Sequence, residues 1–132
     1  MNIFNEKSKL ILSTTHPDLQ KIFTEVVKGF DCTIICGHRN ELDQNEAYRI
    51  RASKLKWPDS KHNSIPARAV DVVPYPLDWK DINRMYYFAG YVKAKAETLN
   101  IKIIWGGDWD NDTEVNDQSF LDLPHFELRG LI

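Results

Sequence analysis

Apolar residues at helical spacing predict two helices that face a common core. Between Pro17 and Gly29 the apolar residues recur at intervals of three and one, so they share one helix face. Pro17 suits the first turn of that helix and Gly29 suits its end. A second helix is expected over residues 78–99, with Asp78 as its N-cap and Asp81 three residues later. The apolar residues of the two faces are Leu19, Ile22, Phe23, Val26 and Val27, and Ile82, Met85, Ala89, Val92, Ala96 and Leu99.

Shorter segments supply a third helix and several strands. Residues 41–55 are expected to be helical, with an inner side formed by Leu42, Ala47, Tyr48 and Leu55. Apolar runs rich in β-branched residues predict strands at residues 31–36, 68–74, 101–105 and 125–128. Because these strands are few, short and interleaved with helices, the pattern favours an α+β fold with a small, mostly antiparallel sheet flanked by helices. The length suits one domain, residues 1–132.

The net charge of the chain argues against nucleic acid as its partner. The net charge is −2, whereas a nucleic-acid-binding protein needs a clustered basic face, so nucleic acid is not expected as a partner. The basic residues Arg49, Arg51, Lys54 and Lys56 lie at helical spacing and are interpreted as a solvated helix face. The N-terminus is too short and too polar for a signal peptide, and no apolar run of about 18 residues exists. We therefore expect a soluble protein that is made in the cytoplasm and does not insert into the membrane.

The two cysteines do not predict a disulfide or a thiol nucleophile. Cys32 and Cys36 would lie on one face of the strand at 31–36, about 13 Å apart at ~3.3 Å per residue. A disulfide needs Cα atoms within about 7 Å. An apolar strand would also raise the pKa of both thiols, which argues against a cysteine hydrolase that uses either of them with His38.

Asp71 is the residue that most strongly indicates a functional site. It lies in the middle of the segment AVDVV, whose other residues are all expected to be buried. An unpaired carboxylate there would cost several kcal/mol, so a positive group should meet it. Arg68 lies three residues away and would point to the opposite face of a strand. A metal cation is the sharper prediction, and an ion pair with a distant arginine or lysine is the alternative.

Two histidines and a further acid complete a candidate metal site. His62 lies in a proline-bounded loop and His125 follows Pro124, and two imidazoles with one carboxylate are typical of catalytic zinc, with a fourth position left for water. Asp122 lies three residues before His125, and Pro124 favours a turn that could aim both side chains into one site. Asp122 is then the predicted general base. Glu127 is the alternative base.

Two loops add candidate contacts. Arg39 follows the predicted strand at 31–36 in a tight turn, where its guanidinium could hold a carboxylate or an oxyanion, and Gln44 could add a neutral contact. The loop after residue 105 carries clustered acids that could bind calcium: Asp108, Asp110, Asp112, Glu114 and Asp117. Because it lacks the EF-hand glycine and spacing, a solvated loop is the favoured interpretation.

Three segments in order resemble one enzyme family. SKHNSIPARAVD at 60–71 resembles the SxHxxGxAxD signature of the zinc D-alanyl-D-alanine peptidases and phage L-alanyl-D-glutamate endopeptidases. GHRNELDQ at 37–44 is similar to the arginine-and-glutamine segment of that family. WGGDW at 105–109, followed by DLPHFEL at 122–128, is similar to its closing segment. The wider group includes lysostaphin-like enzymes and the Hedgehog signalling domain, and its fold is a small antiparallel sheet flanked by helices.

The resemblance implies a role for each matching residue. His62, Asp71 and His125 would hold one zinc ion per chain, and Asp122 would be the catalytic acid and base. The implied contacts to the substrate or its oxyanion are Arg39, Gln44 and Ser60.

The chain also departs from the family pattern at two places. The spacing from His62 to Asp71 is two residues longer than in the signature, and Ala67 replaces its glycine. Glu127 stands where some relatives have a second histidine.

The implied activity is hydrolysis of an amide bond in the peptidoglycan stem peptide. An L-alanyl-D-glutamate endopeptidase of the phage endolysin type is the leading interpretation, and the protein would act as a monomer. It would be made in the host cytoplasm and reach the cell wall or periplasm after the membrane is permeabilised. The alternatives are a D,D- or L,D-carboxypeptidase and a metal-stabilised binding module without catalysis.

Overall fold

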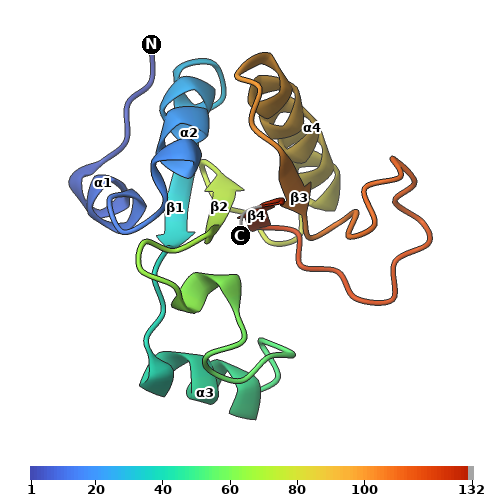
Figure 1. Ribbon diagram of the computed structural model, residues 1–132. Helices are drawn as coiled ribbons and strands as arrows, with labels where there is room; N and C mark the ends of the chain where they lie inside the picture. Colours follow the sequence, from blue (N-terminus) through green and yellow to red (C-terminus); the bar gives the residue numbers. More distant parts are fainter. Residues whose placement is uncertain (131–132) are drawn as a thin grey trace.

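Helices and strands alternate along the chain and meet in one antiparallel sheet (Figure 1). The structure is a computed structural model, and it describes residues 1–130. The elements are α1 (Glu6–Leu12), α2 (Pro17–Gly29), β1 (Cys32–Cys36), α3 (Glu41–Arg49), the 3-10 helix η1 (Lys61–Asn63), β2 (Ala69–Pro74), α4 (Ile82–Thr98), β3 (Ile103–Trp105) and β4 (His125–Leu128). The predicted α+β class with a small antiparallel sheet is confirmed.

The sheet has the strand order β1-β2-β4-β3, and every neighbouring pair is antiparallel. Side chains alternate between the two faces of a strand, so Val70 and Val72 point one way and Asp71 points the other. On β4, Phe126 and Leu128 likewise face the core, while His125 faces away from it. The sheet therefore separates an apolar face from a polar one.

The core lies on the apolar face, under α2 and α4. All five apolar residues that the spacing placed on the inner face of α2 are buried. On α4, Met85, Ala89, Val92 and Ala96 are buried, but Ile82 is 45% exposed. Phe126 of β4 meets the rings of Phe23 and Phe88 edge to face, with centroids 5.5 and 6.1 Å apart. No helix among residues 1–130 is long and apolar enough to cross a membrane.

The structure corrects two predicted helix boundaries. α4 begins at Ile82 rather than near residue 78, because Asp81 is its N-cap and accepts a hydrogen bond from the Arg84 N–H at 3.2 Å. Asp78 instead accepts from the Lys80 N–H within a turn. α3 ends at Arg49 rather than near residue 55, and Arg51 has a left-handed backbone with φ of 64° that cannot continue a helix.

The interpretation of α3 as a helix that packs an apolar side inward is wrong. Leu42 is 81% exposed, Leu55 is 46% exposed, and the only buried residue of this helix is Gln44. α3 lies beyond the end of β1, away from the core helices (Figure 1). Of the four basic residues predicted to share a helix face, only Arg49 is helical. The short helix α1, capped by Asn5, was not predicted because its seven residues carry no apolar stripe.

A bulge in β1 corrects the placement of the cysteines. Cys32 pairs with Pro74 and Ile34 with Val72, but the register then shifts so that Cys36 pairs with Asp71. The extra residue reverses the side-chain alternation, so Cys32 is buried in the core while Cys36 lies on the polar face beside Asp71. In a regular strand the two thiols would share one face, but the bulge places them on opposite faces.

Candidate active site

Three side chains from distant parts of the chain meet on the polar face of the sheet. His62 belongs to η1, Asp71 to β2 and His125 to β4, and Asp71 and His125 are direct register partners. Asp71 Oδ1 lies 3.2 Å from His62 Nε2 and 3.2 Å from His125 Nδ1, and these two nitrogens are 3.3 Å apart. The structure thus brings together all three residues that the sequence proposed as a ligand set.

The three donor atoms have the geometry of a metal site. Zinc bonds of about 2.0 Å in a regular tetrahedron place neighbouring donor atoms about 3.3 Å apart. The triangle of 3.2, 3.2 and 3.3 Å is one face of such a tetrahedron. Asp71 also belongs to two groups whose atoms could hold a metal ion, one with Cys36 and His62 and one with Asp122 and His125. The residues present therefore fit a metal of this coordination type.

Each imidazole is oriented by a contact on its other nitrogen. His62 Nδ1 lies 2.8 Å from the carbonyl oxygen of Gly37, which directs Nε2 toward Asp71. His125 Nε2 lies 2.8 Å from Glu127 Oε1, which directs Nδ1 toward Asp71. Lys61 Nζ donates to the second oxygen of Glu127 at 2.6 Å. Such outer contacts are typical of metal-ligating histidines, because they fix the tautomer and the ring plane.

Burial and opposite charge act against each other in this cluster. Burial lowers the pKa of His62, but the hydrogen bonds to Asp71 and Cys36 and the charge of Asp71 together outweigh burial and raise the pKa to about 10. His125 shows the same balance, with its pKa raised to about 9. For Asp71 burial raises the pKa, but the hydrogen bonds with the two imidazoles hold it well below its usual range. Asp71 is therefore an ionised carboxylate at neutral pH, as a ligand must be.

Asp122 lies at the edge of the cluster. The predicted turn is present: the His125 N–H donates to the Asp122 carbonyl at 3.0 Å, and Asp122 Oδ2 lies 3.9 Å from His125 Nδ1. Its side chain is 30% exposed, more than the three side chains behind it. Burial and the nearby negative charge of Asp71 raise the pKa of Asp122.

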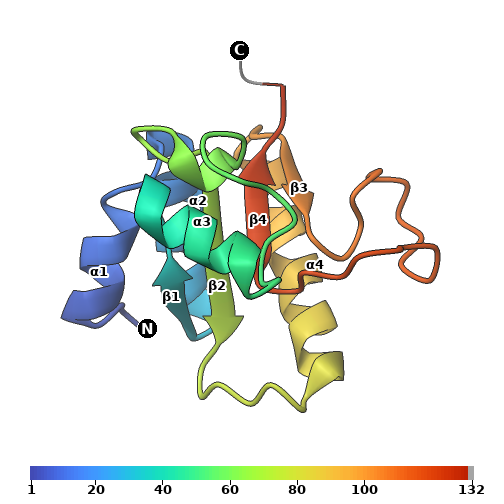
Figure 2. The ribbon, with the colours of Figure 1, turned by 90° about the horizontal axis from the view of Figure 1, so that it is seen from below.

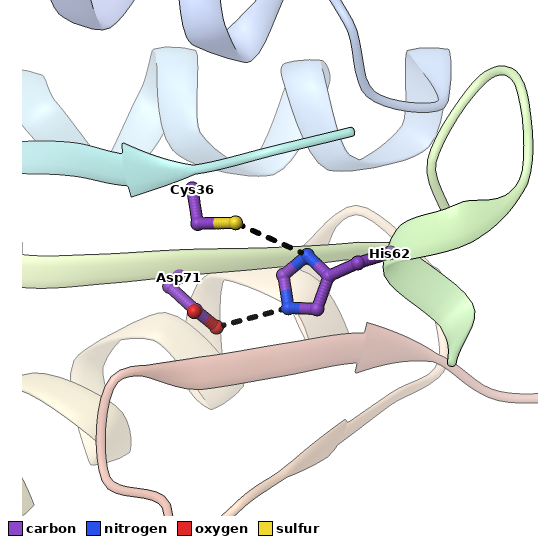
Figure 3. Close-up of side chains that lie close together, drawn as sticks. All are labelled: Cys36, His62 and Asp71. Atoms are coloured by element: carbon purple, nitrogen blue, oxygen red, sulfur yellow. Dashed lines mark hydrogen bonds and ion pairs between the residues drawn. The ribbon is translucent and has the colours of Figure 1, made fainter. Parts of the chain in front are cut away.

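Arg39 reaches the same cluster from the turn after β1. Its Nη2 lies 3.8 Å from Asp71 Oδ2, and its Nη1 donates to Gln44 Oε1 at 3.0 Å. A distant arginine thus also meets Asp71, as the alternative interpretation of this carboxylate required. Cys36 adds its thiol at this point, with Sγ 3.7 Å from His62 Nδ1 (Figure 3). The same sulfur lies 3.4 Å from Arg39 Nη2.

The two remaining predicted contacts are largely covered by protein. Ser60 is 8% exposed and caps η1, where its hydroxyl accepts from the His62 N–H at 3.2 Å. It therefore orients His62 through the backbone, although it also lines the cleft. Gln44 is fully buried and does not line the cleft.

The cluster forms part of the lining of a cleft of about 740 Å³. One wall is residues 52–55 and the other is residues 117–120, part of the long segment that extends from the sheet between β3 and β4 (Figure 2). Lys54 Nζ lies 4.6 Å from the Phe120 ring centroid, so the two walls touch. Trp109 packs against His125, with ring centroids 5.3 Å apart.

Sequence reasoning missed these cleft residues. Trp109 belongs to the WGGDW segment and could have been found there. No local signal singles out Lys54 or Phe120.

The acidic loop between β3 and β4 is tied to the fold at one point. Asp108 is buried, accepts hydrogen bonds from the N–H groups of Asp112 and Thr113, and lies 3.7 Å from Lys93 Nζ. Asp110 and Asp112 are exposed, and their oxygens come close enough to Asp108 to form a group that could hold a cation. Calcium binding there stays a prediction.

Comparison with known proteins now adds to this geometry. The sequence pattern of the phage L-alanyl-D-glutamate peptidase family matches residues 2–129. The chain belongs to this family. The resemblance found in the sequence motifs is thereby confirmed, and the chain is a peptidase rather than a binding module without catalysis.

Two relatives support the same placement. The L-alanyl-D-glutamate peptidase of Escherichia phage T5 is 28% identical over 120 residues, which cover 87% of each chain. The crystal structure of the L-Ala D-Glu endopeptidase ChiX of Serratia marcescens superposes with a TM-score of 0.72 at 26% identity. That superposition covers 95% of this chain and 88% of the other. This chain thus shares its fold, over nearly its whole length, with a solved L-Ala D-Glu endopeptidase.

Proposed function

We propose that this peptidase hydrolyses the amide bond between L-alanine and D-glutamate in peptidoglycan stem peptides, with a zinc ion held by His62, Asp71 and His125. The observation that carries the metal assignment is the triangle of donor atoms, with sides of 3.2, 3.2 and 3.3 Å. Two nitrogens and one carboxylate oxygen are a donor set that suits zinc. When bound, zinc would supply Lewis-acid chemistry by activating water and polarising the scissile carbonyl.

Asp122 is the proposed general base and acid. It is the most exposed carboxylate beside the ligand cluster, and its pKa is raised by burial and by Asp71. A carboxylate with a raised pKa takes a proton from water more readily and can return it to a leaving group. Glu127 fits this role less well. Although burial raises its pKa, the hydrogen bonds with His125 and Lys61 and the charges of these two residues together outweigh burial and hold the pKa below its usual value.

Arg39 is the proposed contact for the substrate carbonyl or a substrate carboxylate. Its guanidinium lies beside Asp71 and lines the cleft, so its charge is directed at the place where a substrate would meet the cluster. Preorganised donors of this kind stabilise charge that develops in the transition state. Ser60 contributes by fixing the backbone of His62.

In the proposed reaction Asp122 carries a proton from water to the leaving nitrogen. A water oxygen forms a bond to the carbonyl carbon of L-alanine while Asp122 accepts a proton from that water. The bond between this carbon and the nitrogen of D-glutamate then breaks as Asp122 returns the proton to the nitrogen. The alanine carbonyl becomes a carboxylic acid, whose remaining proton passes to the released amine, so the products are a carboxylate on alanine and an ammonium group as the new N-terminus of D-glutamate. We propose that the protein does this as a monomer, at the cell wall, after permeabilisation of the membrane.

The test is digestion of purified peptidoglycan, followed by mass spectrometry, together with elemental analysis of the protein. We expect about one zinc per chain and the release of fragments with an N-terminal D-glutamate. A chelator should abolish the release and added zinc should restore it. The Asp122→Asn variant should retain zinc but release few fragments.

Each other outcome points elsewhere. Release of free D-alanine would instead indicate a carboxypeptidase, which the same cluster could also support on a free C-terminal carboxylate. Cleavage that resists the chelator, or a protein without metal, would contradict the ligand assignment.

A further inference from the structure

Gln44 is a polar residue whose environment differs from that of every other residue of α3. It is fully buried, whereas the other residues of this helix are exposed or only partly buried. Its amide makes four contacts. Oε1 accepts from Arg39 Nη1 at 3.0 Å and from Asn63 Nδ2 at 3.1 Å. Nε2 donates to Ser53 Oγ at 3.0 Å and to the Leu55 carbonyl at 2.6 Å.

Among side chains of this size, only an amide has both the acceptor oxygen and the donor nitrogen that these contacts require. The oxygen meets two donors and the nitrogen meets two acceptors, so a carboxylate would satisfy only one end and a thioether neither. A buried amide without partners would be costly, and here all its bonding capacity is used by protein groups. Gln44 has no free group to offer a substrate.

The four contacts join three parts of the site. Arg39 carries the guanidinium beside Asp71, and Asn63 ends the 3-10 helix that carries His62. Ser53 and Leu55 belong to the cleft wall, residues 52–55. One amide thus connects the charged group of the cluster to the wall against which a substrate would lie.

We propose that Gln44 is a positioning residue that holds Arg39 and the cleft wall (residues 52–55) in a fixed relation. The inference rests on the proposed role of Arg39 and replaces the earlier assignment of Gln44 as a direct substrate contact. An error of about 1 Å in the position of a group in an active site can reduce the rate ~100-fold. Loss of the amide should therefore act on catalysis through Arg39 and on substrate binding through the wall.

Two variants separate the two halves of the amide. Gln44→Met is close in size but removes all four hydrogen bonds. Gln44→Glu keeps an acceptor for Arg39 and Asn63 but loses both donors to the wall. We expect Gln44→Met to reduce kcat/KM by ~10- to 100-fold with a fall in kcat, and Gln44→Glu to act mainly by raising KM.

A matched control lies next to it on the same helix. Asn45 also ties α3 to the following loop, because its Oδ1 accepts from the Trp57 N–H at 3.1 Å, but its side chain makes no hydrogen bond to Arg39 or to residues 52–55. Asn45→Ala should keep kcat and KM within about twofold of the unmodified protein. If it matched Gln44→Met, general loosening of the loop would explain the loss, and the proposal would be overturned.

A double-mutant cycle tests whether Gln44 acts through Arg39. If it does, kcat of Arg39→Ala combined with Gln44→Met should equal kcat of Arg39→Ala alone. Losses in kcat that multiply would overturn the proposal. If Arg39→Ala alone were fully active, the proposed role of Arg39 would fail, which is a separate result.

Limited digestion with trypsin measures how firmly the cleft wall is held, independently of enzymatic activity. Arg51, Lys54 and Lys56 are cleavage sites within or beside the wall. Both Gln44 variants should be cut there several-fold faster than the unmodified protein, whereas Asn45→Ala should not. Thermal unfolding and zinc content identify any variant that has lost its fold. Gln44→Glu then carries the test if Gln44→Met fails to fold, and unchanged cleavage and KM in a folded Gln44→Glu would refute the proposal.

Discussion

Glu127 should control how tightly the metal site binds zinc. Its Oε1 lies 2.8 Å from His125 Nε2, and its side chain is only 13% exposed, so the contact is screened little by water. Removal of a partner that orients a metal-ligating histidine typically weakens metal binding by ~10- to 100-fold, which is about 1.4–2.7 kcal/mol. Glu127→Gln keeps an acceptor oxygen but loses the charge, so we expect ~10-fold. Glu127→Ala loses both and should approach ~100-fold.

The measurement is a competition titration against a chromophoric zinc chelator at fixed pH. Lys61→Met is the matched control, because Lys61 Nζ lies 2.6 Å from Glu127 Oε2 but makes no hydrogen bond to His125. Its side chain is 41% exposed, and an exposed ion pair contributes little, so we expect a change of less than about threefold.

Two results would refute this reasoning. Unchanged zinc affinity in both Glu127 variants would show that the contact to His125 does not matter. A loss in Lys61→Met as large as that in Glu127→Ala would assign the effect to the ion pair. The same variants also compare the two candidate bases: at saturating zinc Glu127→Gln should retain most of kcat, and a complete loss would favour Glu127 over Asp122.

Four further predictions follow from the burial and charge of the site and from the packing of the core. Asp122→Asn should reduce kcat by ~10²- to 10⁴-fold. It should also raise the melting temperature of the metal-free protein at neutral pH, because the fold disfavours the ionised form of Asp122. A lower melting temperature in calorimetry would contradict this. In the metal-free protein the fold raises the pKa of His62 and of His125, so protonation of these residues stabilises the fold fully below pH ~6.5. This stability should be lost as the pH rises through about 9 and 10. Denaturant titrations at a series of pH values would test this. Zinc must displace these protons, so binding at pH 7 should release at least one proton, measured by calorimetry in buffers of different ionisation enthalpy. Phe23→Ala should cost about 3–5 kcal/mol in denaturant unfolding, because the ring is fully buried against β4.

The sequence alone determined features that depend on neighbouring residues. The apolar spacing, Pro17 and Gly29 together defined α2, because a helix face and its ends are set within a few turns of chain. The four strands were found for the same reason: the strand at 125–128 matches its prediction, and the other three begin one or two residues later than predicted. The prediction that Asp71 meets positive partners also needed only its apolar neighbours, because burial of an unpaired carboxylate is costly wherever it occurs.

Contacts between distant segments were decided only by the tertiary structure. The bulge in β1 turns Cys36 from the core toward His62, and it exists only in the pairing of β1 with β2. α3 was expected to bury apolar residues but buries Gln44, because its neighbours are Arg39 and the cleft wall rather than the core. Lys54 was predicted to lie on a solvated helix face, and its contact with Phe120 joins residues 66 positions apart. A local pattern records which side chains are apolar, but the partner of a polar side chain is fixed only when the chain has folded.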